Sequence, residues 1–157
     1  MNLTMIEHAM EVEIDAPVAR VWKALTRQAS SWWHPGFLSR PGAKAFVIEP
    51  HVGGRAYEDC GDGQGLVWYT VIGLAENELL QLMGDLDAAY GGPARLHTTF
   101  RLREKGKRTV VRLEECAFGR VAADTRDKLA GGWKLLLDGC LKVFAETGAP
   151  PAEWPAF

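Results

Sequence analysis

Several features that would assign a chain to a familiar class are missing from this sequence. Cys60, Cys116 and Cys140 are an odd number of cysteines and lie far apart, which fits neither a disulfide framework nor C-x-x-C metal spacing. Charges or glycines interrupt every apolar run well before the roughly 18 to 20 residues that a transmembrane helix needs. We therefore expect no membrane insertion and reduced cysteines.

A large excess of positive or negative charge is also missing. The net charge of −2 and the pI near 6.1 give no general electrostatic reason to bind nucleic acid, and there is no long basic run or zinc-finger spacing. The first residues, MNLTMIEHAM, lack the basic region and the apolar core of a secretory signal. We expect a cytoplasmic protein without a nucleic-acid partner.

The composition is that of an ordinary folded domain. Hydrophobic residues make up 47% of the 157 residues and charged residues 24%, so the chain can bury a core of its own. We expect one domain over residues 1–157, with its core at about 8–147 and a proline-rich C-terminal tail at 148–157.

The first elements are a strand and two short helices. In HAMEVEID, residues 8–15, Met10, Val12 and Ile14 alternate with acidic residues, which predicts a strand with one wet face. Asp15 is placed to cap a helix that has Pro17 in its first turn and an apolar stripe through residues 18–25. QASSWWHPGF, residues 28–37, then predicts a second short helical turn that ends in a loop.

From Lys44 to about Phe118 the pattern is β throughout. Strands are predicted near residues 45–50, 54–60, 65–74, 78–84, 95–104 and 108–117, and short polar or glycine-bearing turns separate them. Connections this short favour antiparallel pairing. Together with the first strand, these predicted strands make a meander of about seven strands.

The last element is a long amphipathic helix, DTRDKLAGGWKLLLDGCLKVFAETG. Asp124 is placed to cap it, and Gly148 with the prolines that follow ends it. An apolar face this long must lie against the inner face of the sheet, so the two form the core of an α+β protein. The residues on that face are Leu129, Trp133, Leu136, Leu137, Cys140 and Phe144.

Four segments carry a more specific signal: IDAPVARVWKALTRQASSWW, EPHVGGRAYE, QGLVWYTV and GGWKLLLDGCLKVF. They resemble successive parts of the START-like superfamily, also called SRPBCC or helix-grip, in its branch related to the activator of the heat-shock-protein ATPase. The resemblance implies a curved antiparallel sheet of about seven strands wrapped around a long C-terminal helix, with two short helices after the first strand. It also implies an apolar cavity between sheet and helix, which in relatives holds lipids, steroids, polyketides or other hydrophobic molecules.

The polar stretch EPHVGGRAYEDCGDGQG, residues 49–65, has the residue types of a metal site. However, strand alternation sends Glu58 and Cys60 to one face and Asp59 to the other, so Glu49 and His51 would need a fortunate register to join them. A phosphate site is disfavoured because no helix follows the glycines. We therefore predict a turn between strands, with no metal and no cofactor.

One acid is predicted to point inward. If Val111 and Leu113 face the core, alternation brings Glu115 inside as well, whereas it places His97 on the outer face. A buried carboxylate suits a general acid or a ligand hydrogen bond. The alternative is that Glu115 lies at the rim of the sheet and is simply hydrated.

Aromatic side chains supply the other candidates, although most of them also fit a plain core. Trp133 and Leu137 on the helix, and one of Trp32 or Trp33 at the mouth, are the strongest candidates for the cavity wall. The full set of predicted cavity residues is Trp32, Trp33, Phe37, Tyr57, Trp68, Phe100, Glu115, Trp133 and Leu137.

The leading functional hypothesis is a binding protein that encloses a small hydrophobic molecule: a lipid, steroid, polyketide or aromatic compound. The sequence shows no catalytic triad spacing and no H-E-x-x-H motif. The alternatives are an enzyme of the polyketide cyclase or dehydratase kind, with Glu115 as its acid or base, and a co-chaperone or stress-related module with a protein partner.

Overall fold

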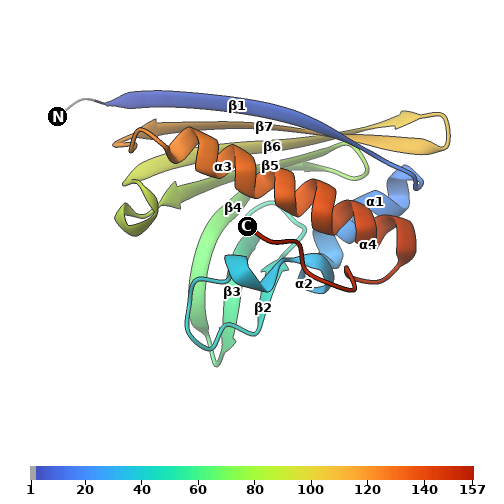
Figure 1. Cartoon of the computed structure of the whole chain (residues 1–157), viewed down its shortest axis with the longest axis horizontal. Coiled ribbons are helices and arrows are strands. Elements are labelled where there is room, and N and C mark those ends of the chain that lie inside the picture. Colours follow the sequence, from blue (N-terminus) through green and yellow to red (C-terminus); the bar gives the residue numbers. More distant parts are fainter. Residues whose placement is uncertain (1–2) are drawn as a thin grey trace.

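The computed structural model describes residues 3–157, and its main element is a curved sheet with a long helix across its inner face (Figure 1). The sheet has seven strands in the order β1-β7-β6-β5-β4-β3-β2, and all neighbours are antiparallel. This confirms the predicted α+β helix-grip fold and its meander. The strands are β1 (Thr4–Ile14), β2 (Ala45–Ile48), β3 (Arg55–Gly61), β4 (Gln64–Ala75), β5 (Leu79–Leu86), β6 (Ala94–Lys105) and β7 (Arg108–Gly119).

The helices also match the predicted order. Two short helices, α1 (Val18–Arg27) and α2 (Ala29–Trp32), follow β1, and the 3-10 turns η1 (Pro35–Phe37) and η2 (Ala88–Tyr90) lie in loops. The C-terminal helix runs through α3 (Thr125–Lys134), the π-helical segment η3 (Leu135–Leu141) and α4 (Lys142–Thr147). Within residues 3–157, none of the helices has both the length and the hydrophobicity of a transmembrane span.

Neither predicted helix cap makes a side-chain hydrogen bond, although Asp124 does occupy the position that precedes the last helix. Helix α1 begins after Pro17, and no side chain caps it. Asp124 precedes α3 with φ −96° and ψ 0°, whereas a capping residue is usually extended. The Asp124 carboxylate instead lies 2.7 Å from Nζ of Lys128.

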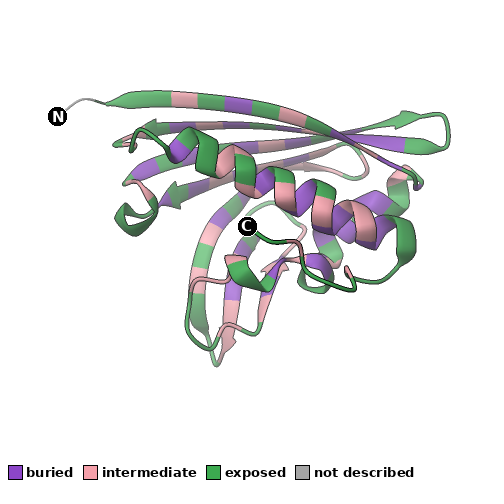
Figure 2. Cartoon of the chain, viewed as in Figure 1, coloured by how far each residue is buried: buried purple, intermediate pink, exposed green. Residues whose placement is uncertain are grey.

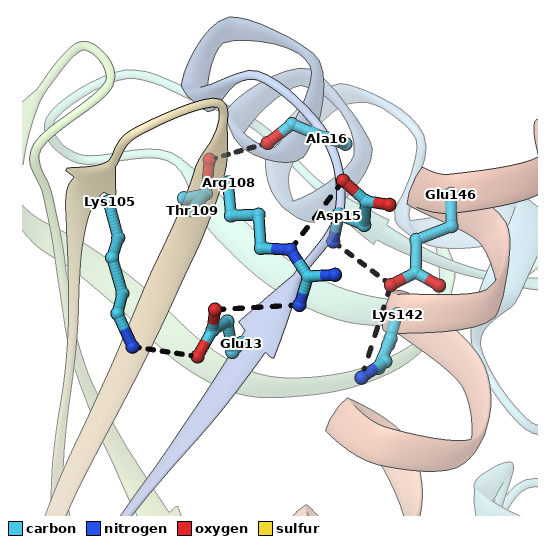
Figure 3. Close-up of polar contacts among 8 residues, drawn as sticks. All are labelled: Glu13, Asp15, Ala16, Lys105, Arg108, Thr109, Lys142 and Glu146. Atoms are coloured by element: carbon cyan, nitrogen blue, oxygen red, sulfur yellow. Dashed lines mark hydrogen bonds and ion pairs between the residues drawn. The ribbon is translucent and has the colours of Figure 1, made fainter.

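Polar contacts connect the turn between β1 and α1 to the end of the C-terminal helix on one side and to β7 on the other (Figure 3). The backbone N–H of Asp15 donates to Oε1 of Glu146 at 2.9 Å, and Oγ1 of Thr109 on β7 donates to the carbonyl of Ala16 at 2.8 Å. Arg108 approaches Asp15 at 3.8 Å. The helix is therefore anchored at α4, and α3 extends from there over the sheet.

The core lies between the inner face of the sheet and the helix, and buried positions recur along both (Figure 2). Val12 and Ile14 on β1, and Val111 and Leu113 on β7, are at most 5% exposed, as alternation predicts. The helix buries nearly all of its predicted apolar face, with Leu129 half-buried. The buried members are Trp133, Leu136, Leu137, Cys140 and Phe144.

Strand β4 breaks the regular alternation twice. Trp68 has no partner on β3, and Ile72 has none on β5, so each is the extra residue of a β-bulge. Between the two bulges, Tyr69 and Val71 are buried. Trp68 and Tyr69, although adjacent in sequence, therefore both reach the inside of the sheet.

Candidate functional site

A cavity of about 450 Å³ lies between the helix and the sheet, within the usual range of ligand pockets. Its wall combines the end of α2, η1, β2, β4, the η2 loop and the face of α3. Elements from both layers of the fold thus build one site.

Aromatic side chains form a large part of the wall. Trp33 stacks on Phe46 with ring centroids 3.7 Å apart, and Trp133 meets Trp33 edge-on at 6.0 Å. On the side of β4, Trp68 lies 5.4 Å from Tyr90 of the η2 turn. These rings offer faces and edges to a planar apolar ligand.

Polar groups at the cavity are few. Ser39, Asp124 and Lys128 line it, and Asp124 and Lys128 are paired with each other. Thr125 also lines it and is only 2% exposed. Within residues 3–157, buried polar side-chain atoms without a hydrogen-bond partner are His8 Nδ1, Trp33 Nε1 and Thr125 Oγ1. Two of these three atoms therefore belong to residues that line the cavity.

Glu115 is buried behind this wall at 3% exposure. Its Oε1 lies 2.9 Å from Nε2 of His8, its register partner on β1. Its Oε2 accepts from Thr98 Oγ1 at 2.5 Å, from Trp133 Nε1 at 3.1 Å and from Tyr69 OH at 3.4 Å. Tyr69 and Trp133 also line the cavity, so the carboxylate supports two residues of its wall.

Burial controls two ionisable groups near the helix. It raises the pKa of the Tyr69 hydroxyl well above its usual value of 10, and the charge of Glu115 adds to the effect. It also raises the pKa of the Cys140 thiol to about 11. Both groups hold their protons at neutral pH, so Tyr69 acts as a hydrogen-bond donor and Cys140 is no nucleophile.

A second buried carboxylate, Glu58, holds the loop between η1 and β2. It is 0% exposed and accepts from the N–H of Ser39 at 2.7 Å, the hydroxyl of Ser39 at 3.1 Å and the N–H of Arg40 at 2.9 Å. It also accepts from Nε1 of Trp68 at 3.1 Å. Glu58 therefore positions one aromatic wall of the cavity and the loop beside it.

Residues 49–54 at the start of the polar stretch form a turn with local pairing, and the rest of the stretch continues into β3 and β4. Arg55 donates to Glu49 through Nε at 2.7 Å and Nη2 at 3.1 Å, and this pairing lowers the pKa of Glu49 to about 2. Gly53 has φ +85°, and a Cβ on Gly54 would lie 2.2 Å from the carbonyl oxygen of Glu49, so the turn requires both glycines. His51 is exposed. Among residues 3–157, no three His, Cys, Asp or Glu side chains come close enough to hold a metal.

Four of the predicted cavity residues line the cavity: Trp33, Phe37, Trp68 and Trp133. Trp33, rather than Trp32, is the tryptophan at this wall. Trp32 is 0% exposed in the core, where its Nε1 donates to the carbonyl of Ala24 at 2.7 Å.

The other predicted residues lie outside the cavity wall. Phe100 is behind Trp133, with ring centroids 5.3 Å apart, and Leu137 is in the core at 1% exposure. Glu115 reaches the cavity only through its partners. Tyr57 lies on the outer face of β3, opposite the buried Glu58, with the Arg55 guanidinium 4.3 Å from its ring centre. His97 is exposed on the outer face, as expected.

The prediction missed Tyr69, Tyr90, Phe46 and His8. For His8 a signal existed, because it is in phase with Met10, Val12 and Ile14 on β1 and so faces inward. For Tyr69 strand alternation gave no such signal, because the bulge at Trp68 interrupts the alternation along β4.

Residues 149–157 pack beside the cavity. His34 accepts from the N–H of Gly36 through Nδ1, so its Nε2 carries the proton and donates to the carbonyl of Pro155 at 2.8 Å. The ring of Phe157 lies 4.9 Å from both His34 and Phe37, centre to centre. This C-terminal segment therefore supports η1, and with it the Phe37 wall of the cavity.

Replacing Gly36 with alanine is expected to displace Phe157, because the new Cβ would lie 2.3 Å from its ring. Removal of that ring from His34 and Phe37 should change the environment of the adjacent Trp154, which tryptophan fluorescence and aromatic NMR shifts can detect. Gly131→Ala is the control, since nothing lies within 4 Å of that Cβ position. An unchanged Phe157 ring environment in the Gly36 variant would contradict the contact.

Comparisons with known proteins agree with this architecture. The model of the Activator of Hsp90 ATPase homolog 1-like protein family matches residues 15–145. No curated protein sequence gives a significant match.

Several solved structures share the fold. DynU16, from the dynemicin biosynthetic locus, superposes with a TM-score of 0.66 at 24% identity over 92% of this chain, which spans only about half (48%) of DynU16. CalU16 from Micromonospora echinospora gives 0.65 at 19% identity, covering 98% of this chain and 86% of CalU16. The Aha1 dimer from Colwellia psychrerythraea gives 0.58 at 21% identity, covering 91% and 98%.

At these identities the structures establish the fold alone, whereas the family model covers most of the chain. The chain therefore belongs to the family of Activator of Hsp90 ATPase homolog 1-like proteins, within the START-like superfamily.

Proposed function

We propose that this protein binds a small, largely aromatic hydrophobic molecule in the cavity between the sheet and the C-terminal helix. The observation that carries the proposal is the cavity of about 450 Å³ with several aromatic rings in its wall. Burying apolar ligand surface there yields roughly 25 cal/mol per Å², so few polar contacts are needed for useful affinity. The likeness to DynU16, whose gene lies in a biosynthetic locus, is consistent with a small-molecule ligand.

The arrangement favours binding over catalysis by Glu115. That carboxylate is fully enclosed by His8, Thr98, Trp133 and Tyr69 and does not line the cavity. A general acid must come within hydrogen-bond reach of the reacting group. In this geometry Glu115 instead orients the residues that do face a ligand.

A thermal-shift screen with fatty acids, steroids, flavonoids and aromatic acids tests the proposal. A planar aromatic ligand at 100 times its Kd stabilises the folded state by about 2.7 kcal/mol, which for a chain of this size raises Tm by roughly 5 to 10 °C. If no compound of any of these classes raises Tm, the proposal fails.

Substitutions at two neighbouring glycines test whether the compound binds in this cavity. Gly132 lines the cavity, and a Cβ there would already lie 3.3 Å from Phe37, whereas a Cβ at Gly131 meets nothing within 4 Å. Gly132→Leu therefore fills the cavity and should abolish the ligand-induced shift, while Gly131→Leu should keep it. Equal shifts in both variants would place the ligand elsewhere.

A further inference from the structure

The hydroxyl of Tyr69 is the least firmly held donor of the Glu115 cluster. Three donors converge on Oε2 of Glu115, while Oε1 is taken by His8. A carboxylate oxygen has two lone pairs, and the contacts from Thr98 at 2.5 Å and Trp133 at 3.1 Å can occupy both. The Tyr69 contact, at 3.4 Å, is longer than the usual 2.5–3.0 Å of a hydroxyl hydrogen bond.

The residue that carries this hydroxyl also borders the cavity. Tyr69 lines the cavity, and its hydroxyl approaches Glu115 beside Trp133, which lines the cavity as well. Because burial and the neighbouring carboxylate keep the phenol protonated, it offers a proton and carries no charge. A ligand atom that accepts this proton would gain a bond that Glu115 supplies only weakly.

We propose that Tyr69 determines specificity in this cavity by donating a hydrogen bond to an acceptor oxygen, such as a ketone, on a planar aromatic ligand. The inference rests on the proposed function and adds the chemistry of the ligand to it. Glu115 and Thr98 act as positioning residues, because Thr98 occupies the lone pair for which Tyr69 would otherwise compete.

9-Fluorenone and fluorene are suitable probes, since they share a planar three-ring skeleton and differ in a carbonyl against a methylene group. Dissociation constants for both are measured by tryptophan fluorescence quenching in the unmodified protein and in Tyr69→Phe. Loss of one net hydrogen bond should weaken fluorenone binding about 3- to 10-fold. Fluorene binding should stay the same, because the aromatic ring at position 69 remains.

Two further variants sharpen the test. Tyr57→Phe, which removes a hydroxyl from the outer face of β3, should leave both dissociation constants unchanged. Thr98→Val frees a lone pair on Glu115 for Tyr69 and should selectively weaken fluorenone binding even though Tyr69 is intact. This variant also provides the measurement if Tyr69→Phe does not fold.

The outcomes separate the inference from the proposed function. Selective loss of fluorenone affinity in the Tyr69 and Thr98 variants supports the inference. Equal weakening of both probes, or no weakening in either variant, overturns the role of Tyr69 while binding in the cavity stands. If neither probe binds to the unmodified protein, the proposed function fails for planar aromatic ligands, and the inference fails with it.

Discussion

Replacing Glu115 with alanine is expected to lower the free energy of unfolding by about 3–5 kcal/mol, because several buried donors lose their acceptor at roughly 1–3 kcal/mol each. The substitution leaves His8 Nε2, Thr98 Oγ1 and Trp133 Nε1 without their acceptor in the core, and each unpaired buried group carries a desolvation cost. Chemical denaturation followed by circular dichroism measures the change.

Glu114 supplies the matched control. It is the preceding residue on β7, lies on the outer face and pairs at the surface with the half-buried Arg112. Glu114→Ala should change stability only slightly, because exposed ion pairs contribute little. Glu115→Gln should fall between the two, since the amide keeps one acceptor oxygen but directs an NH₂ group at donors. A loss in Glu115→Ala no larger than in Glu114→Ala would show that the buried cluster is not an integral part of the core.

Replacing Glu58 with alanine is the change with the second-largest expected effect, a loss of about 2–4 kcal/mol. Two backbone N–H groups, the Ser39 hydroxyl and the Trp68 indole would lose their acceptor, and hydrogen bonds to a charged group are worth about 1.5–3 kcal/mol each before water replaces some of them. Unlike the Glu115 change, this one should also release the loop beside η1. Amide hydrogen exchange at Ser39 and Arg40 should therefore accelerate.

Glu49 on the same hairpin is the comparison for this variant. Its carboxylate pairs with Arg55 at the surface, so Glu49→Ala should leave exchange at Ser39 and Arg40 unchanged and cost much less stability. Unaltered exchange at Ser39 and Arg40 in the Glu58 variant would mean that other contacts hold the loop.

Regular periodicity made most of the fold predictable. Alternation on β1 and β7, and the apolar face of the last helix, depend on local spacing, and the structure follows them. The inward position of Glu115 followed from the same rule because β7 has no bulge between Val111 and Glu115.

The cavity wall was less predictable because two of its determinants are not local. If apolar residues of Ala-Tyr-Glu-Asp face inward and polar ones outward, Tyr57 lies inside and Glu58 outside. The structure shows the reverse. The N–H groups that donate to Glu58 come from Ser39 and Arg40, 19 and 18 positions earlier in the chain. On β4 the side that Tyr69 faces depends on a bulge whose position is set by pairing with β3. Neither partner is visible from the spacing of these residues alone.

The two bulges of β4 have a consequence for how the strand can be altered. Trp68 and Ile72 each act as a single-residue insertion in the strand. Deleting either one would restore regular alternation, and the neighbouring side chains would keep the faces of the sheet that they occupy now. Deleting Trp68 would thus take one ring from the cavity and leave Tyr69 and Val71 facing the core. A substitution at position 68 keeps the extra residue and the bend that comes with it. The ring and the bulge at this position can therefore be removed separately, the ring by substitution and both together by deletion.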